Sequence, residues 1–129
     1  MTIRSFEVIL YVADQAHSRD FYAAILGLTP ALDVPGMTEF QIGDATLGLM
    51  PSRGIKRLLG DSIKNPELTR DIPRCELYLT VDDPNLYASL AIESGARLLS
   101  PLARRDWGHD VVYLADPDEH IIAFARALP

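Results

Sequence analysis

The chain repeats one pattern of elements twice. Residues 7–27 have the features of a strand, a helix N-cap, a helix and a terminating glycine, and the same order returns from Glu76. Asp83 follows Glu76 at the same distance in the sequence as Asp14 follows Glu7, and both are predicted helix N-caps. A repeat of this length is too long for a solenoid unit and indicates a duplicated half-domain. The fold is therefore expected to contain two similar modules.

The first module is predicted to be β-α-β-β-β. Period-two alternation over residues 6–12 indicates a strand. Its predicted faces are Phe6, Val8, Leu10 and Val12 on one side and Glu7, Ile9 and Tyr11 on the other. A helix is expected over 15–26, with its apolar stripe on the Val8/Leu10 face and Gly27 as its stop. Shorter strands are expected at 31–34, 37–42 and 45–50.

The second module repeats this order, with a strand at 75–81 and a helix at 84–94. The helix is predicted to bury Tyr87, Leu90 and Ala91, and the predicted strands that follow are 97–102, 110–115 and 120–126. The sequence therefore predicts one α+β domain over 1–129, with modules near 1–50 and 74–127 and helices on the outside of curved sheets. The connector at 51–73 is either a linker with a short helix or a lid.

Composition narrows the possible partners and locations. The chain of 129 residues carries a net charge of −6, which argues against nucleic acid or an anionic membrane as a partner. Cys75 is the only cysteine, so it is expected to be a small buried hydrophobe. No apolar run is long enough for a membrane span, and the expected location is the cytoplasm. No nucleotide-binding or hydrolase motif is present.

Glu7 and Glu76 stand at equivalent places on the two first strands, on the faces that the helices do not cover. Those faces are expected to line a concave surface where a small ligand binds. Two carboxylates in one cavity would repel each other, so the pKa of at least one should rise. The alternative is that they form ion pairs with arginines, for which the candidates are Arg97, Arg104, Arg105 and Arg126.

The opening and closing stretches of the chain resemble those of a known superfamily. The stretch Glu7-x-x-x-x-Val12-x-Asp14, followed by Ser18-x-x-Phe21-Tyr22-x-x-x-Leu26-Gly27, is similar to the opening of the vicinal oxygen chelate superfamily. That superfamily includes the glyoxalase, bleomycin-resistance, fosfomycin-resistance and extradiol-dioxygenase proteins. Trp107-Gly108 and Tyr113-x-x-Asp116-Pro117-Asp118 resemble its closing stretch. The resemblance covers nearly the whole chain and implies paired β-α-β-β-β modules that usually form homodimers, with modules exchanged in some members.

The resemblance transfers only part of the metal site of the superfamily. Its ligands come from the first and last strands of each module, and Glu7 and Glu76 match the first-strand positions. The last-strand positions fall on Ala123 and on Gly48 (Leu49 if the alignment slips by one), which offer no ligand. A divalent metal is possible but the site is predicted to be incomplete, and no other cofactor is expected. Glu119 replaces the glycine usual in the superfamily's closing turn, which predicts a turn without positive φ there.

These residues and the resemblance lead to two candidate functions. The first is a small-molecule-binding protein of the glyoxalase/bleomycin-resistance type. Its predicted ligand-binding residues are Glu7, Tyr11, Glu76, Tyr78, Trp107 and Tyr113. The alternative is a metal-dependent lyase or dioxygenase with Glu7 and Glu76 as metal ligands. A third class, an interaction module acting through residues 51–73, has no motif in its favour.

Overall fold

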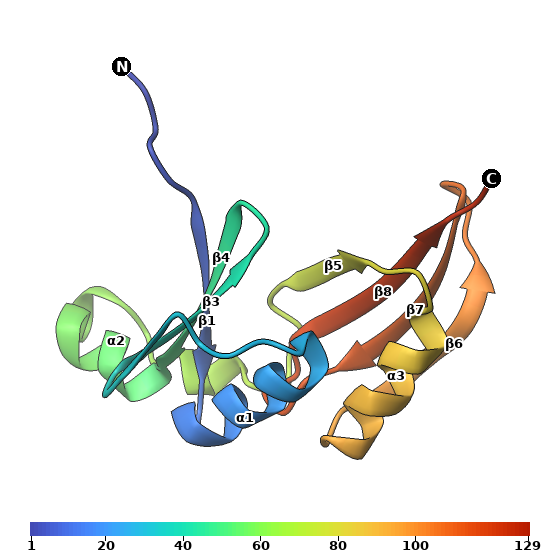
Figure 1. The fold of residues 1–129 in the computed structure, drawn as a ribbon. Coiled ribbons are helices and arrows are strands. Elements are labelled where there is room, and N and C mark those ends of the chain that lie inside the picture. The colour runs from blue at the N-terminus through green and yellow to red at the C-terminus, as the bar shows by residue number, and fades with distance from the viewer. The chain divides into compact units, whose positions relative to one another are not determined.

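A computed structural model describes residues 1–129, which form two compact units, Met1–Leu68 and Thr69–Pro129. Each unit contains one four-stranded sheet and one long helix in the order β-α-β-β-β (Figure 1). The predicted α+β fold with two tandem modules and open, curved sheets is therefore confirmed. No helix is long and apolar enough to cross a membrane.

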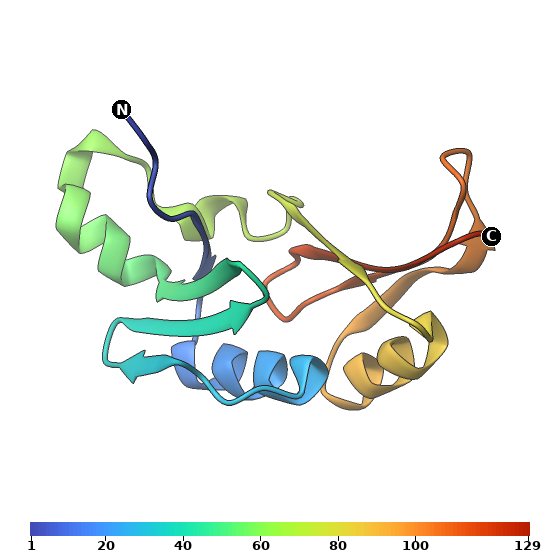
Figure 2. The ribbon, with the colours of Figure 1, turned by 45° about the horizontal axis from the view of Figure 1, so that its top comes forward.

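The first unit has the strand order β1-β4-β3-β2. Strand β1 pairs in parallel with β4, and the other pairings are antiparallel. The bounds are β1 Glu7–Val12, α1 Gln15–Leu26, β2 Leu32–Val34, β3 Met37–Ile42 and β4 Ala45–Pro51. Figure 2 shows α1 (blue) running alongside the β2–β3 strands.

Local signals determine both ends of α1. The Asp14 side chain accepts a hydrogen bond from the His17 backbone N–H at 2.9 Å, which satisfies one of the free donors of the first turn. Gly27, at φ 64°, ends the helix in the left-handed conformation that glycine adopts without a Cβ penalty. The buried stripe of the helix is Ser18, Phe21, Tyr22 and Ile25.

The stripe of α1 covers only part of the β1 face predicted for it. Leu10 and Val12 are buried, but Val8 is 38 % exposed and Phe6 is 68 % exposed. The prediction that the helix covers Val8 is therefore wrong. Strand β1 is an edge strand, and α1 packs against β3 and β4, so the amino-terminal end of β1 extends past the helix.

The connector at 51–73 contains a short helix. Helix α2 spans Ser52–Leu59 directly after β4, and two 3-10 turns follow, η1 at Gly60–Ser62 and η2 at Pro66–Thr69. Lys56 stabilises the end of α2 because its Nζ donates to the Gly60 carbonyl at 2.7 Å and to the Ile63 carbonyl at 2.8 Å. These bonds satisfy carbonyls at and just beyond the C-terminus of the helix.

The second unit repeats the arrangement with strand order β5-β8-β7-β6. Its bounds are β5 Glu76–Thr80, α3 Pro84–Glu93, β6 Arg97–Arg104, β7 His109–Ala115 and β8 Ile121–Ala127. Helix α3 buries Ala88 and Ala91, whereas Leu90 is 37 % exposed. The predicted burial of Leu90 is therefore wrong. The Tyr87 ring instead packs on Phe124 of β8 at 5.4 Å between centroids, which rotates the helix stripe toward Ala88.

The turn between β7 and β8 is held by Asp116. Its Oδ1 accepts from the backbone N–H groups of Asp118 at 2.8 Å and of His120 at 2.9 Å. Glu119 lies in this turn with φ 69°, the only non-glycine residue with positive φ. The prediction that this position avoids positive φ is therefore wrong: the backbone keeps the conformation that glycine would favour, with a glutamate in it.

Candidate functional site

Four of the six predicted site residues lie in the second unit. On the strands, the register of β5 on β8 and of β8 on β7 puts one set of side chains on a single face, because paired residues of neighbouring strands point the same way. We call this the Glu76 face. It is formed by Glu76, Tyr78, Thr80, His109, Val111, Tyr113, Ile121, Ala123 and Ala125.

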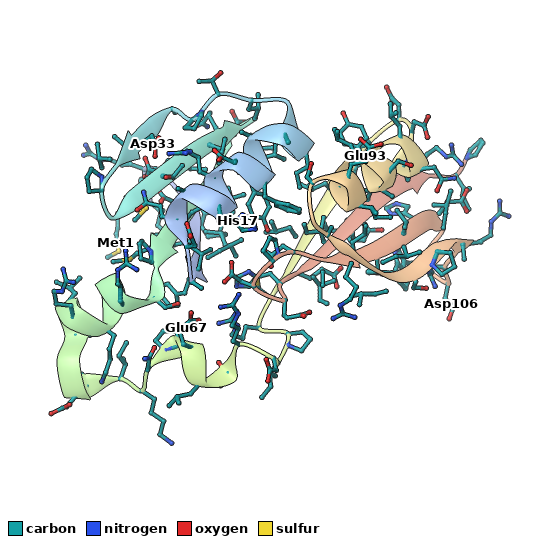
Figure 3. The ribbon with its side chains drawn as sticks, turned by 90° about the horizontal axis from the view of Figure 1, so that it is seen from below. Met1, His17, Asp33, Glu67, Glu93 and Asp106 are labelled. Atoms are coloured by element: carbon teal, nitrogen blue, oxygen red, sulfur yellow. The ribbon has the colours of Figure 1, made fainter.

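Three side chains from different places in the sequence form a hydrogen-bonded cluster on this unit. The Tyr78 hydroxyl from β5 lies 2.6 Å from His109 Nδ1 at the start of β7. Trp107, in the β6–β7 turn, donates from its Nε1 to the same hydroxyl at 2.8 Å. Figure 3 labels Asp106, the residue before Trp107 in this turn. The Tyr78 and His109 rings are 5.8 Å apart and tilted by 31°.

Tyr113 lies on the same face under an arginine. The Arg105 guanidinium sits 5.1 Å from the centre of the Tyr113 ring, which is a cation–π geometry. Arg105 is fixed there by bonds to Ser100 Oγ at 2.9 Å and to the Val111 carbonyl at 3.0 Å. Burial raises the pKa of the Tyr113 phenol, the Glu76 and Tyr78 charges raise it further, and Arg105 partly opposes them. The Tyr113 phenol therefore keeps its proton at physiological pH.

Glu76 has none of the arginine partners considered for it. Arg97 pairs with Glu119 at 2.7 Å, and Arg104 and Arg126 both pair with Asp110, at 3.8 and 3.2 Å. The fourth candidate, Arg105, lies over the Tyr113 ring. The hypothesis that Glu76 is a structural ion-pair partner of these arginines is therefore wrong, and its exposed carboxylate is available to a ligand.

In the first unit, Glu7 meets a carboxyl group that local sequence patterns did not indicate. Glu39 of β3 and Ile9 of β1 both pair with Gly48, so Glu7, two residues before Ile9, shares a face with Glu39. A Cβ on Gly48 would lie 2.5 Å from Glu7 Oε2, because the Glu7 side chain occupies the space that the glycine leaves. Partial burial, a hydrogen bond with Glu39 and the Glu39 charge together raise the pKa of Glu7 from 4.5 to about 7.

We predict that Glu7→Gln stabilises the protein more at pH 8 than at pH 4.5. The folded protein keeps a proton on Glu7 between pH 4.5 and about 7, whereas the unfolded chain loses it. The stability contributed by the protonated form is thus fully present below pH 4.5 and is lost as the pH rises through 7. The gain at pH 8 should be about 1 kcal/mol or less, because solvent screens an exposed carboxyl.

Urea denaturation at both pH values measures this difference. Glu39→Gln is the companion variant, since it removes the Glu39 charge, one cause of the raised pKa, and should reduce the effect of pH. Equal pH dependence in the original protein and in Glu7→Gln would contradict the prediction.

Tyr11 lies on the same face of β1 as Glu7, and its side chain is 36 % exposed. A cavity of about 440 Å³ in this unit lies elsewhere, around the first turn of α1 and the β2–β3 turn. It is lined by Asp14, Gln15, Arg19, Arg53, Val34 and Asp33, the last labelled in Figure 3. None of the six predicted site residues lines this cavity.

The metal ligands that the superfamily would supply are not complete in this chain. Gly48 and Ala123 have no donor atom, and no group of three or more His, Cys, Asp or Glu side chains gathers where it could hold an ion. His120 is not available as a ligand from its buried position, because its Nδ1 bonds Asp116 at 2.9 Å and its Nε2 lies 3.2 Å from Arg74. The residues present do not fit a complete chelate site.

Two residues of the candidate site could not be identified from the sequence, for the same reason. Glu39 and the role of His109 depend on strand register, which joins residues far apart in the chain. Period-two alternation in 37–42 would place Glu39 on the same face as Met37 and Gln41, but only the β3–β4–β1 pairing brings it to Glu7.

The two modules, each a sheet with one long helix, define the class of protein. Residues 6–129 match the glyoxalase-like domain, and the chain belongs to this family within the vicinal oxygen chelate superfamily. No curated protein matches the chain.

Solved structures support the same fold. A glyoxalase-related enzyme from Fulvimarina pelagi is 21 % identical with a TM-score of 0.79, covering 95 % of this chain and 87 % of that one. A glyoxalase/bleomycin resistance protein/dioxygenase family enzyme from Burkholderia phytofirmans PsJN is 17 % identical, with a TM-score of 0.78 and coverages of 95 % and 97 %. A lactoylglutathione lyase from Agrobacterium tumefaciens is 23 % identical, with a TM-score of 0.69 and coverages of 94 % and 91 %. At these identities the likeness concerns the fold.

Proposed function

We propose that the protein binds a small molecule on its sheet faces, as a glyoxalase/bleomycin-resistance type of binding protein. Glu76, Tyr78, Trp107 and Tyr113 would contact a ligand on the second unit, and Glu7 and Tyr11 would contact a ligand on the first. The observation that carries the proposal is the Trp107–Tyr78–His109 cluster, in which hydrogen bonds hold partly exposed aromatic rings beside the unpaired carboxylate of Glu76. Ordered aromatic rings next to a carboxylate favour a planar or cationic ligand.

Trp107 gives this proposal a direct test because it is the only tryptophan. Metal-free bleomycin, a cationic molecule with planar rings, is a suitable probe. Its addition should change the Trp107 emission saturably, and calorimetry should give the same Kd. Glu76→Gln should weaken binding about tenfold, or about 1.4 kcal/mol.

Tyr87→Phe serves as the matched control, because Tyr87 packs against Phe124 on the opposite face of the same sheet. It should bind the probe with unchanged affinity. Absence of saturable binding in both emission and calorimetry would contradict the proposal for ligands of this kind.

The metal-dependent lyase or dioxygenase remains the rival function, with Glu7 and Glu76 as ligands. Elemental analysis of protein purified without chelator separates the two. A stoichiometric divalent metal that is lost in Glu76→Ala would favour the enzyme, and formation of lactoylglutathione from methylglyoxal and glutathione would identify it as a lyase.

We also propose a homodimer, because each sheet leaves an edge strand with unpaired backbone groups, β1 in one unit and β5 in the other. Exposed edges invite pairing with another chain. Light scattering at micromolar concentration should return twice the mass of 14.3 kDa, and a monomer mass would contradict this prediction. The cytoplasmic location stays a prediction from the sequence.

A further inference from the structure

The Tyr78–His109 contact has the geometry of a nucleophile and its base. A nucleophilic hydroxyl is activated when a base lies within about 2.6–3.2 Å of it. Tyr78 Oη and His109 Nδ1 are 2.6 Å apart, and Trp107 Nε1 bonds the same oxygen at 2.8 Å. All three side chains belong to the second unit.

The hydrogen positions follow from what each group can donate. The indole N–H is only a donor, so the Tyr78 oxygen accepts from Trp107. In the tautomer that carries the imidazole proton on Nε2, the Tyr78 O–H donates to His109 Nδ1. Loss of the phenolic proton to Nδ1 would leave the oxygen charge beside an indole N–H that already points at it.

We propose that Tyr78 is a histidine-activated nucleophile that accepts an acyl group from small activated esters. Tyr78 Oη attacks the ester carbonyl carbon while its proton passes to His109 Nδ1. The bond from that carbon to the leaving oxygen then breaks, and the electron pair departs with the leaving group. His109 returns its proton to the departing oxygen or to solvent, and an O-acyl tyrosine remains.

Tyr78 differs from Tyr22 and Tyr113 in the accessibility of its hydroxyl to a small ester. It is 38 % exposed and Trp107 is 56 % exposed, so an ester can reach the pair. Tyr22 is fully buried, and Tyr113 lies beneath the Arg105 guanidinium with a raised pKa. Tyr78 therefore combines an accessible hydroxyl with a hydrogen bond to an imidazole.

The test is acylation by p-nitrophenyl acetate, followed as release of p-nitrophenol and by peptide mass spectrometry. We expect a burst of about one equivalent per chain with acetyl on Tyr78. Tyr78→Phe should abolish the burst, and His109→Gln should slow it at least tenfold, since a positioned base typically contributes 10²–10⁴-fold. Trp107→Phe should slow it less.

Tyr87→Phe is the control that should leave the burst unchanged. Circular dichroism and denaturation of each variant separate loss of the nucleophile from loss of the fold. Acetyl located on lysines or the N-terminus instead of Tyr78, or a burst that His109→Gln leaves intact, would overturn the proposal. No bleomycin or other ligand is added, so this outcome is independent of the ligand-binding test.

Discussion

Replacement of Asp116 by Ala should cost about 3 kcal/mol or more of unfolding free energy. Asp116 is 3 % exposed, and its carboxylate bonds the backbone N–H groups of Asp118 and His120 and the His120 imidazole at 2.8–2.9 Å. The substitution leaves three donors without that partner in a buried place. Each buried unsatisfied group costs about 1–3 kcal/mol.

Asp116→Asn should also be destabilising, although it preserves the shape of the side chain. Arg74 can only donate, so its contact of 3.2 Å makes His120 Nε2 an acceptor and leaves the imidazole proton on Nδ1. With its NH2 toward Nδ1, asparagine would set two donors against each other, and with its oxygen there its NH2 would oppose the backbone N–H groups of Asp118 and His120. Moving the proton to Nε2 would create the same conflict with Arg74.

Urea denaturation of the two variants measures these losses. Asp110→Asn is the matched control, because Asp110 forms ion pairs with arginines at a partly exposed site. Such pairs contribute about 0–1 kcal/mol. An Asp116→Ala protein as stable as Asp110→Asn would show that the turn does not depend on this carboxylate.

Local signals were sufficient for much of the fold. Helix α1 runs over Gln15–Leu26 as predicted, because Asp14 and Gly27 mark its ends by interactions within a few residues of the chain. Strand ends are not determined by local signals, and β6 continues to Arg104, beyond the predicted end at 102. A strand ends where its partner ends, and the partner is not visible in a local pattern.

The candidate site depends more on the pairing register of the strands than on the alternation of residues along each strand. Glu76 and Tyr78 are two residues apart in one strand, so alternation alone places them on one face, and their partners on β8, Ile121 and Ala123, are likewise two residues apart. The raised pKa of Glu7 follows from burial and from Glu39, both determined by long-range pairing. The prediction for the φ angle of Glu119 was wrong for a different reason. Its positive φ is imposed by the bonds that Asp116 makes across the turn.

Ala123→Glu restores the carboxylate that this superfamily usually carries in its last strand, and it should cost about 3 kcal/mol or more. Ala123 is fully buried in a cluster with Val111 and Ala125, against which Tyr113 packs. Added side-chain volume in a close-packed site typically costs about 1–3 kcal/mol, and a buried carboxylate without a partner adds a desolvation cost.

The control is Ala127→Glu, which places the same side chain at an exposed position of the same strand. It should change stability by about 0.5 kcal/mol or less. Denaturation in the presence and absence of zinc or nickel distinguishes two explanations for the alanine. If Ala123→Glu is as stable as Ala127→Glu, or if added metal recovers its stability, then the site can accept a ligand and the alanine is not required for packing. If the loss persists with metal present, the second sheet has a packed alanine at the position where the superfamily resemblance implies a chelating carboxylate.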